Sequence, residues 1–338
     1  MRAREGDLIR TNSNVVFDVK GLVHPPHKII AFPRYIPEAE GLRKNQTSAY
    51  GKVYSLGDRF KYLQQNQPDL IVDDPVFGET LCEVPIDQVA EIYRPSERLA
   101  EFRKGKNFSV LEEKAIRLAE NLRERAGIPW SKIGISGSIM AGLTTSGSDI
   151  DPVVYGIDNS RKAYAGLEEL HSEEDSGFKP YTRAELKVLY DFRSKDTQMS
   201  FEDFQVVESR KAFQGMFMDI DYFVRFVKDW DEVKEQYGDV CYQNSGYAKI
   251  VATILDSQEA LFTPCSYKLG NVQVKEGPKL APISEVVSFR GRFCQQAVEG
   301  EKIEAQGKIE LVTDKKSGNK HYRLILGNKP QDYMVLRH

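Results

Sequence analysis

The sequence has 338 residues, of which 41% are hydrophobic and 29% are charged, and its formal net charge is −3. This composition is typical of globular domains and excludes collagen, disordered tails and coiled-coil rods, while the length allows two or three domains. No stretch approaches the roughly 18 uninterrupted apolar residues of a membrane-spanning helix, and residues 1–7 lack the apolar segment of a signal peptide. We therefore expect a cytoplasmic protein without membrane association.

Residues 1–95 are predicted to form a β-rich N-terminal module. Strand-like apolar runs at 15–17 and 28–32 are separated by a glycine and a His-Pro-Pro-His turn. A short strand near 52–56 and a helix over 56–64 are expected to follow.

Residues 96–232 are predicted to form an α/β (α+β) core with a mixed sheet. Ser109 and Glu112 have the spacing of a capping box, so a helix should begin there, and Gly127 and Pro129 should end it. Further elements are then expected in chain order: a strand at 132–136, a glycine-containing turn, a strand at 150–155, helices at 160–171, 183–193 and 201–213, and strand character over 216–227.

Residues 233–283 are predicted to be a mixed linker region, and residues 284–338 a small β-barrel of the OB-like type. Glycines interrupt the strand-like alternation of this last segment, as in a small twisted sheet or barrel. Residues 289–293, Phe-Arg-Gly-Arg-Phe, interleave aromatic and basic side chains as nucleic-acid-binding barrels do, although simple alternation of core and rim residues gives the same pattern.

The cysteines and the overall charge limit the kinds of partner. The four cysteines, at 82, 241, 265 and 294, stand singly without a Cys-x-x-Cys pair, so the spacing of a zinc ribbon is absent and a secreted disulfide framework is not favoured. The small net charge argues against nucleic-acid binding by bulk electrostatics, so such a partner would need a local basic patch.

The segment 134–151 contains the residues most suited to chemistry. A strand is predicted to end at Gly137-Ser138, and the chain then returns in a strand that carries Asp149 and Asp151. Because side chains alternate along a strand, these two carboxylates should share one face with Cα atoms roughly 6 to 7 Å apart. Two such charges repel each other, and divalent cations with oxygen ligands would relieve that repulsion.

Phosphate-binding groups are expected beside these carboxylates. The Gly137-Ser138 turn offers backbone N–H groups and a hydroxyl, and glycine permits a close approach. A phosphate cradle next to metal-binding carboxylates suits phosphoryl transfer with two metal ions. A third carboxylate should come from a neighbouring strand, and residues 216–225 supply Asp219 and Asp221 on the face that Arg225 shares.

These motifs resemble a known family. Gly137-Ser138, then Gly142, then Ser148-Asp149-Ile150-Asp151 are similar to the signature of the DNA polymerase β-like nucleotidyltransferase superfamily, G-S-x-x-x-G followed after six residues by D-x-D. The resemblance is strongest over 108–228, and the flanking segments resemble, more loosely, those of archaeal predicted nucleotidyltransferases.

The resemblance implies roles for individual residues. Asp149 and Asp151 would bind Mg²⁺ or Mn²⁺, and Asp221, or alternatively Asp219, would be the third ligand and the candidate base. Gly137, Ser138 and Ser148 would contact the nucleotide. Many members carry arginines where this chain has Ile139 and Ala141, so the phosphate charge needs another partner, for which Lys211 and Arg225 are candidates.

The expected activity is the Mg²⁺-dependent transfer of a nucleoside monophosphate from an NTP, such as ATP, to a hydroxyl group, with release of pyrophosphate. The acceptor hydroxyl would belong to RNA or another nucleic acid, to a protein or to a small molecule. The alternative is a catalytically inactive protein with the same fold that senses nucleotides or binds RNA. The sequence determines neither the preferred NTP nor the oligomeric state.

Overall fold

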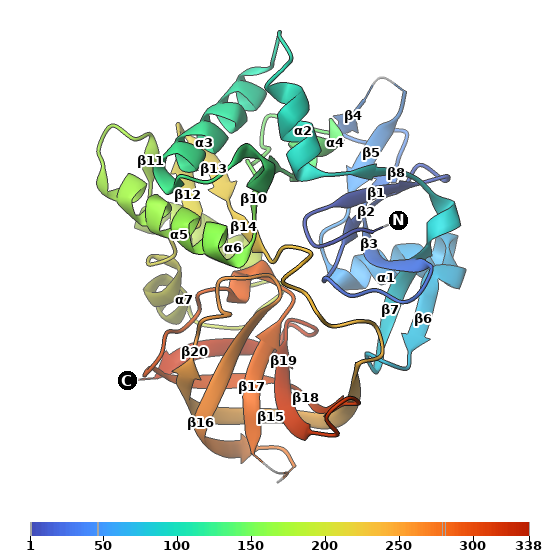
Figure 1. Cartoon of the computed structure of the whole chain (residues 1–338), viewed down its shortest axis with the longest axis vertical. Coiled ribbons are helices and arrows are strands. Elements are labelled where there is room, and N and C mark those ends of the chain that lie inside the picture. The colour runs from blue at the N-terminus through green and yellow to red at the C-terminus, as the bar shows by residue number, and fades with distance from the viewer. Residues whose placement is uncertain (1, 46, 279, 281, 338) are drawn as a thin grey trace. The chain divides into compact units, whose positions relative to one another are not determined.

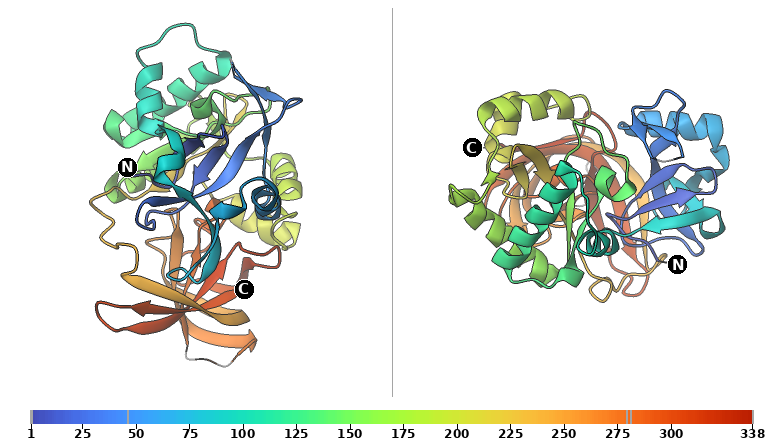
Figure 2. Two further views of the ribbon diagram at one scale, coloured as in Figure 1. Left: turned by 90° about the vertical axis from the view of Figure 1, so that its right-hand side faces the viewer. Right: turned by 90° about the horizontal axis from the view of Figure 1, so that it is seen from above.

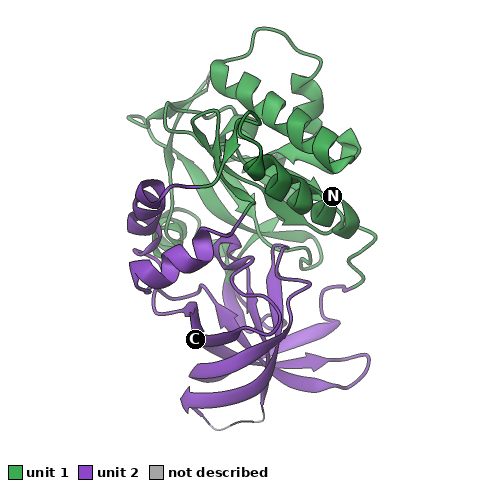
Figure 3. Cartoon of the chain, turned by 90° about the vertical axis from the view of Figure 1, so that its left-hand side faces the viewer, with its two compact units in different colours: residues 1–72, 81–180, 212–234 green, residues 73–80, 181–211, 235–338 purple. Residues whose placement is uncertain are grey.

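The computed structural model describes residues 2–45, 47–278, 280 and 282–337. It contains helices and several β-sheets, so the expected mixed α and β class is confirmed, whereas the nucleotidyltransferase core stays a prediction. Two compact units interleave along the chain (Figure 3). Unit 1 comprises residues 1–72, 81–180 and 212–234, and unit 2 comprises residues 73–80, 181–211 and 235–338. Within the described ranges, no helix combines the length and apolar character that a membrane crossing requires.

Most of the N-terminal third folds as an eight-stranded sheet (Figure 1). Its main path runs β4-β5-β3-β2-β1-β8, and β7 pairs with both β3 and β6. The strands are β1 (Leu8–Thr11), β2 (Val16–Val19), β3 (Lys28–Pro37), β4 (Arg43–Lys44), β5 (Ala49–Lys52), β6 (Ile71–Asp74), β7 (Glu79–Pro85) and β8 (Val89–Tyr93). The helix α1 (Leu56–Asn66) begins at Ser55, whose hydroxyl accepts a hydrogen bond from the backbone of Asp58. Short 3₁₀ helices occupy η1 (Pro68–Leu70) and η2 (Ile86–Gln88).

The rest of unit 1 contains two three-stranded sheets and their helices. One sheet has the order β14-β10-β9, with β10 parallel to β14 and antiparallel to β9; the other has the order β11-β12-β13. The elements are α2 (Pro95–Phe102), α3 (Val110–Ala126), η3 (Trp130–Lys132), β9 (Ile133–Ile135), α4 (Gly137–Ala141), β10 (Pro152–Tyr155), α5 (Ile157–Ser172), β11 (Phe178–Lys179), β12 (Gln214–Phe217), β13 (Ile220–Phe223) and β14 (Arg225–Val227). The capping box at Ser109 and Glu112 is confirmed, and α3 ends at Gly127 in the left-handed conformation.

The region 216–227 is not one strand. Met218 and Asp219 have φ values of 49° and 66°, and Phe217 pairs with Ile220, so these two residues form the tight loop of a hairpin between β12 and β13. The apolar alternation continues on both sides of the loop, which is why the sequence suggested continuous strand character. Asp219 therefore lies in a hairpin loop rather than on the strand that carries Asp221.

Unit 2 contains the expected C-terminal barrel. The strands β15 (Val240–Asp256), β16 (Cys265–Glu276), β17 (Ile283–Ser288), β19 (Lys320–Leu326) and β18 (Lys302–Asp314) follow one another in the sheet, and pairing between β15 and β18 closes the barrel. β17 and β19 run parallel, and β20 (Tyr333–Arg337) adds to β18. Figures 1 and 2 show these strands in orange and red. The same unit includes α6 (Arg183–Arg193), α7 (Phe201–Glu208) and η4 (Gly291–Phe293).

The predicted linker at 233–283 is wrong, because it contains the first two barrel strands. Along β15 the small or apolar residues Ala248, Ile250, Ala252 and Ile254 are buried, while every second residue between them is more exposed. This alternation is the pattern of a strand with one covered face. The barrel therefore begins at Val240 rather than at residue 284, and the predicted helix at 201–213 ends at Glu208.

The His-Pro-Pro-His turn gives the first testable prediction. The ring of His24 accepts a hydrogen bond from the Ile30 backbone N–H at Nδ1 (3.2 Å), so its Nε2 carries the proton and donates to the Ala3 carbonyl (2.9 Å). Burial lowers the pKa of His24 from 6.5 to about 4. The unfolded chain therefore binds the proton first, and stability that is fully present above pH 6.5 is lost as the pH falls toward 4.

The variant His24→Gln keeps a hydrogen-bond donor and an acceptor but does not titrate. When the pH falls from 7 to 5, we expect the free energy of unfolding to fall by about 1 to 2 kcal/mol less in this variant than in wild type. Urea unfolding at both pH values measures this difference. His27→Asn, at an exposed position of the same turn, should keep the wild-type pH dependence. Equal losses in wild type and His24→Gln would contradict the assignment.

Candidate functional site

A parallel backbone bridge brings three predicted carboxylates to one side of two chain segments. The Ile150 N–H donates to the Asp221 carbonyl (2.9 Å), and the Phe223 N–H donates to the Ile150 carbonyl (3.0 Å), so Ile150 lies opposite Tyr222. Both of these side chains are buried. Because side chains alternate, Asp149, Asp151 and Asp221 belong to the opposite face. The bridge thus favours Asp221 over the loop residue Asp219 as the third carboxylate.

The Gly137 turn lies directly against one of these acids. Gly137 has φ +65°, and a Cβ atom at this position would overlap Oδ2 of Asp151. The Ser136 N–H also donates to the Asp151 carbonyl (2.8 Å). Only glycine combines the left-handed backbone with this contact. The predicted phosphate-binding turn and the predicted metal-binding acid are therefore neighbours.

The three serines of the motif have different environments. Ser136 donates through Oγ to the Gly6 carbonyl (2.6 Å), and Ser148 accepts from the Thr145 N–H (2.9 Å), so both stabilise local structure. Ser138 is only 2% exposed, and its Oγ has no hydrogen-bond partner among the described residues. A buried polar atom without a partner costs free energy, so the hydroxyl of Ser138 is suited to contact a ligand.

The two strand acids repel each other. Burial, followed by the charge of Asp149, raises the pKa of Asp151 to about 7, although Arg225, Lys52 and Arg34 act in the opposite direction. Near neutral pH the Asp151 carboxyl is therefore partly protonated. A bound cation would relieve the same repulsion.

The donor set fits Mg²⁺ or Mn²⁺ in kind, because these ions prefer carboxylate oxygens and the mutual repulsion of Asp149 and Asp151 favours a cation. Asp149, Asp151 and Asp221 are the residues that would hold it. In the part of the chain that the structure describes, no three His, Cys, Asp or Glu side chains converge as a ready metal site. The site is thus a pair of close carboxylates with a third on the adjoining segment.

The sequence did not reveal two cations of the N-terminal sheet that belong to this site. Arg34 on β3 and Lys52 on β5 both act on the charge of Asp151. Burial first, and Arg34 second, lower the pKa of Lys52 to about 8, while Asp149 and Asp151 oppose this shift. Roughly 100 residues separate these cations from the acids in the sequence, and no local motif marks them. Only the fold of unit 1 shows that they share one electrostatic environment.

Arg225, a candidate phosphate partner, acts on the charge of Asp151. Its guanidinium pairs with the buried carboxylate of Glu5. Burial alone would raise the pKa of Asp18, but Lys20 at 2.8 Å and the nearby Arg225 hold that pKa well below its usual range. Arg225 therefore already has an anionic partner, in a network of charges that also includes Lys20 and Asp18.

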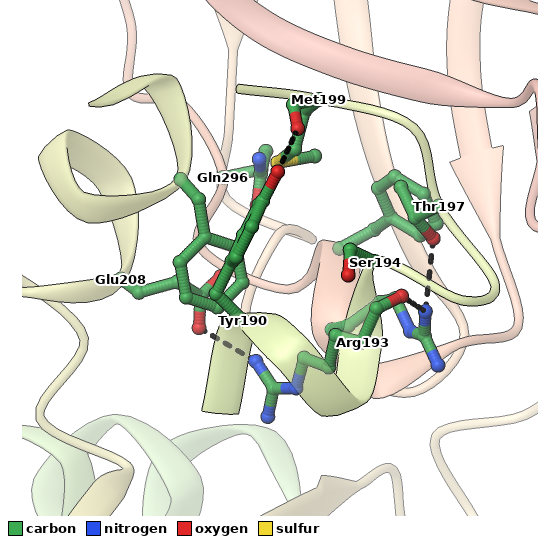
Figure 4. A pocket seen from close by; sticks show the side chains of 10 residues that line it. Tyr190, Arg193, Ser194, Thr197, Met199, Glu208 and Gln296 are labelled. Carbon is green, nitrogen blue, oxygen red and sulfur yellow. Dashed lines mark hydrogen bonds and ion pairs between the residues drawn. The ribbon is translucent and has the colours of Figure 1, made fainter. Parts of the chain in front are cut away.

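Lys211 is not a phosphate ligand of this site, which corrects the prediction. It belongs to unit 2, is 2% exposed, and burial lowers its pKa. Its ammonium donates to Glu208 (2.5 Å), to the Arg292 carbonyl (2.8 Å) and to Gln296 (2.9 Å). Glu208 and Gln296 line the small pocket of Figure 4, where Arg193 also pairs with Glu208 (2.7 Å). Lys211 therefore neutralises a buried acid.

The aromatic and basic alternation at 289–293 has a structural explanation. Phe293 is a core residue that is 1% exposed. Arg292 donates to the Arg193 carbonyl (3.2 Å) and to Thr197 (2.9 Å), and Arg290 pairs with Asp196 (3.1 Å). These contacts stabilise unit 2 and favour the core-and-rim interpretation of this segment.

Comparison with known proteins identifies a relative of this chain but does not indicate an activity. No protein-family model matches the chain, and no solved structure matches it. The chain is 34% identical over 336 residues to the "Uncharacterized protein MJ1086" of Methanocaldococcus jannaschii, and the match covers 97% of this chain and 96% of the relative. At this identity, over nearly the full length of both proteins, the chain belongs to the family of that Methanocaldococcus jannaschii protein.

Proposed function

We propose that the protein is a metal-dependent nucleotidyltransferase that moves a nucleoside monophosphate from an NTP to a hydroxyl group and releases pyrophosphate. The observation that carries this proposal is the bridge between Ile150 and Tyr222, because it adds Asp221 to the side of Asp149 and Asp151. This is the arrangement of acids that the resemblance to DNA polymerase β-like nucleotidyltransferases implies. The contact between Gly137 and Asp151 supports it further.

Each residue of the site would have its own role in the proposed transfer. Gly137 leaves room for the Asp151 carboxylate to lie against the turn, and Ser138 supplies a hydroxyl that lacks a described partner. Asp221 is solvent-exposed, so an acceptor hydroxyl can reach it, and it is the candidate base. Asp149, Asp151 and Asp221 would hold Mg²⁺ or Mn²⁺, which would supply neutralising charge to the phosphates and lower the pKa of the acceptor hydroxyl.

The acceptor class and the base preference follow from one labelling experiment. The purified protein is incubated with each α-labelled NTP and Mg²⁺ or Mn²⁺ in cell extract, and the product is then treated with RNase or protease. Label released by RNase assigns an RNA acceptor, label released by protease assigns a protein, and label that resists both assigns a small molecule. Absence of transfer with all four NTPs would favour the inactive nucleotide-sensing or RNA-binding alternative.

The acids at 219 and 221 give a matched pair of variants for this assay. We expect Asp221→Asn to reduce transfer at least 100-fold, because it removes the third carboxylate from the bridged segment. Asp219→Asn should retain transfer within about threefold, since asparagine tolerates the left-handed loop conformation and Asp219 lies outside the strand. Chelation with EDTA should abolish transfer by wild type. Equal losses in the two variants would reject the assignment of Asp221.

Metal binding is testable without turnover. We expect Mn²⁺ at millimolar concentration to raise the melting temperature of wild type by a few degrees, because a ligand that binds only the folded state stabilises it. Asp149→Asn and Asp151→Asn should lose this increase, whereas Asp175→Asn, at an exposed position of unit 1, should retain it. A Mn²⁺ response that survives in both strand variants would place the metal elsewhere.

Alanine substitutions at two glycines of the motif distinguish the effect of backbone strain from the effect of contact with the Asp151 carboxylate. Gly137 and Gly142 both have left-handed φ values, but a Cβ atom at Gly142 would meet nothing within 4 Å. We expect both alanine variants to lose about 1 kcal/mol of stability through the backbone. Only Gly137→Ala must also displace the Asp151 carboxylate, so only this variant should lose transfer strongly, by 100-fold or more. Similar activity of the two variants would argue against a role for the contact between Gly137 and Asp151 in transfer.

A further inference from the structure

Opposite charges meet in unit 1 without forming ion pairs. Asp149 and Asp151 are partly buried, and so are Arg34 and Lys52. Each pair acts on the charge of the other, yet within the described ranges none of these four side chains has a salt-bridge partner. Charges that are partly desolvated and not paired with each other are unfavourable. A ligand with its own charges would fit between them.

The packing of the N-terminal sheet against the motif fixes this arrangement. Tyr35 on β3 and Tyr50 on β5 form one apolar cluster with Met140 and Leu143, which follow the Gly-Ser turn. Lys52 lies directly opposite Tyr35 in the pairing of β3 with β5. Directly opposed residues share a face of the sheet, so Lys52 lies on the side of Tyr35 that meets the motif.

A second contact ties the sheet to the motif loop. The guanidinium of Arg43 on β4 donates to the Leu143 carbonyl (2.6 Å) and lies 5.6 Å from the ring of Tyr35. Arg43 is only 7% exposed, so this bond is sheltered from water. The cations of β3 and β5 therefore have a fixed position relative to the loop that carries Asp149.

The two cations are also held close to each other. The ring of Tyr54 lies 5.0 Å from the ammonium of Lys52 and 5.6 Å from the guanidinium of Arg34. The two like charges repel each other, and the charge of Arg34 contributes, after burial, to the lowered pKa of Lys52. An anion bound by both groups would convert this repulsion into attraction.

The same packing explains why the motif lacks arginines. Ile139 is 1% exposed, and Ala141 packs against the cluster that contains Tyr35 and Tyr50. A side chain at either position is committed to apolar packing and not to a phosphate. The motif positions that could carry arginines are thus used for packing against the same sheet that carries Arg34 and Lys52.

We infer that Arg34 and Lys52 form a clamp for the polyphosphate of the nucleotide, supplied by the N-terminal sheet in place of the arginines absent at Ile139 and Ala141. This inference rests on the proposed function for the identity of the nucleotide. The clamp itself requires only a polyphosphate anion. The guanidinium offers paired donors to two phosphate oxygens, and the ammonium supplies a point charge.

The test measures binding of inorganic tripolyphosphate to the full chain by isothermal titration calorimetry, with and without Mg²⁺. We expect Arg34→Gln and Lys52→Gln each to weaken binding at least tenfold, and the double variant to weaken it about 100-fold. Lys44→Gln, at an exposed position on β4 of the same sheet, is the matched control and should bind within twofold of wild type. Lys52→Arg should also retain binding, which separates loss of charge from loss of packing.

The outcomes separate the clamp from the proposed activity. If no NTP supports transfer but the double variant loses tripolyphosphate binding, the activity is wrong and the clamp stands as a polyphosphate site. If wild type transfers nucleotide and the double variant keeps its KM for NTP, the activity stands and the clamp is wrong. The clamp is also overturned if wild type does not bind tripolyphosphate, or if the double variant binds it as wild type does.

Discussion

The backbone bridge between Ile150 and Tyr222 is the constraint on which the candidate site depends. Two hydrogen bonds set the register of two segments that are about 70 residues apart in the sequence. Since side chains alternate, this register decides which residues enter the core and which acids share the opposite side. A shift by one residue would bury Asp221 and expose Tyr222. The buried pair Ile150 and Tyr222 makes such a shift costly, so apolar packing on one side fixes the carboxylates on the other.

The sequence predicted those parts of the site that local chemistry determines. Glycine at 137, the alternation of Asp149 and Asp151, and the capping box at Ser109 each follow from rules that act within a few residues. The sequence did not predict the hairpin loop at Met218 and Asp219, because neither residue is the glycine or asparagine that is most common in such loops. The first barrel strands were not predicted because β15 begins with a polar run, Gln243-Asn244-Ser245 followed by Gly246, which is typical of a linker, and the strand-like alternation starts only at Ala248.

The cations of the site were unpredictable for a different reason. Arg34 and Lys52 belong to no motif, and their relation to Asp151 exists only because Tyr35 and Tyr50 pack against Met140 and Leu143. Lys211 shows the reverse error, since a basic residue near the third acid in the sequence folds into unit 2 beside Glu208. Charge arrangements that depend on tertiary packing are visible in a fold and not in a pattern of residues.

The interleaving of the two units has a consequence for dividing the chain. The backbone passes from one unit to the other at 72/73, 80/81, 180/181, 211/212 and 234/235. Because there are five crossings, no single cut of the chain leaves both units whole. Exchanging either unit by recombination would require several separate segments to be replaced at once.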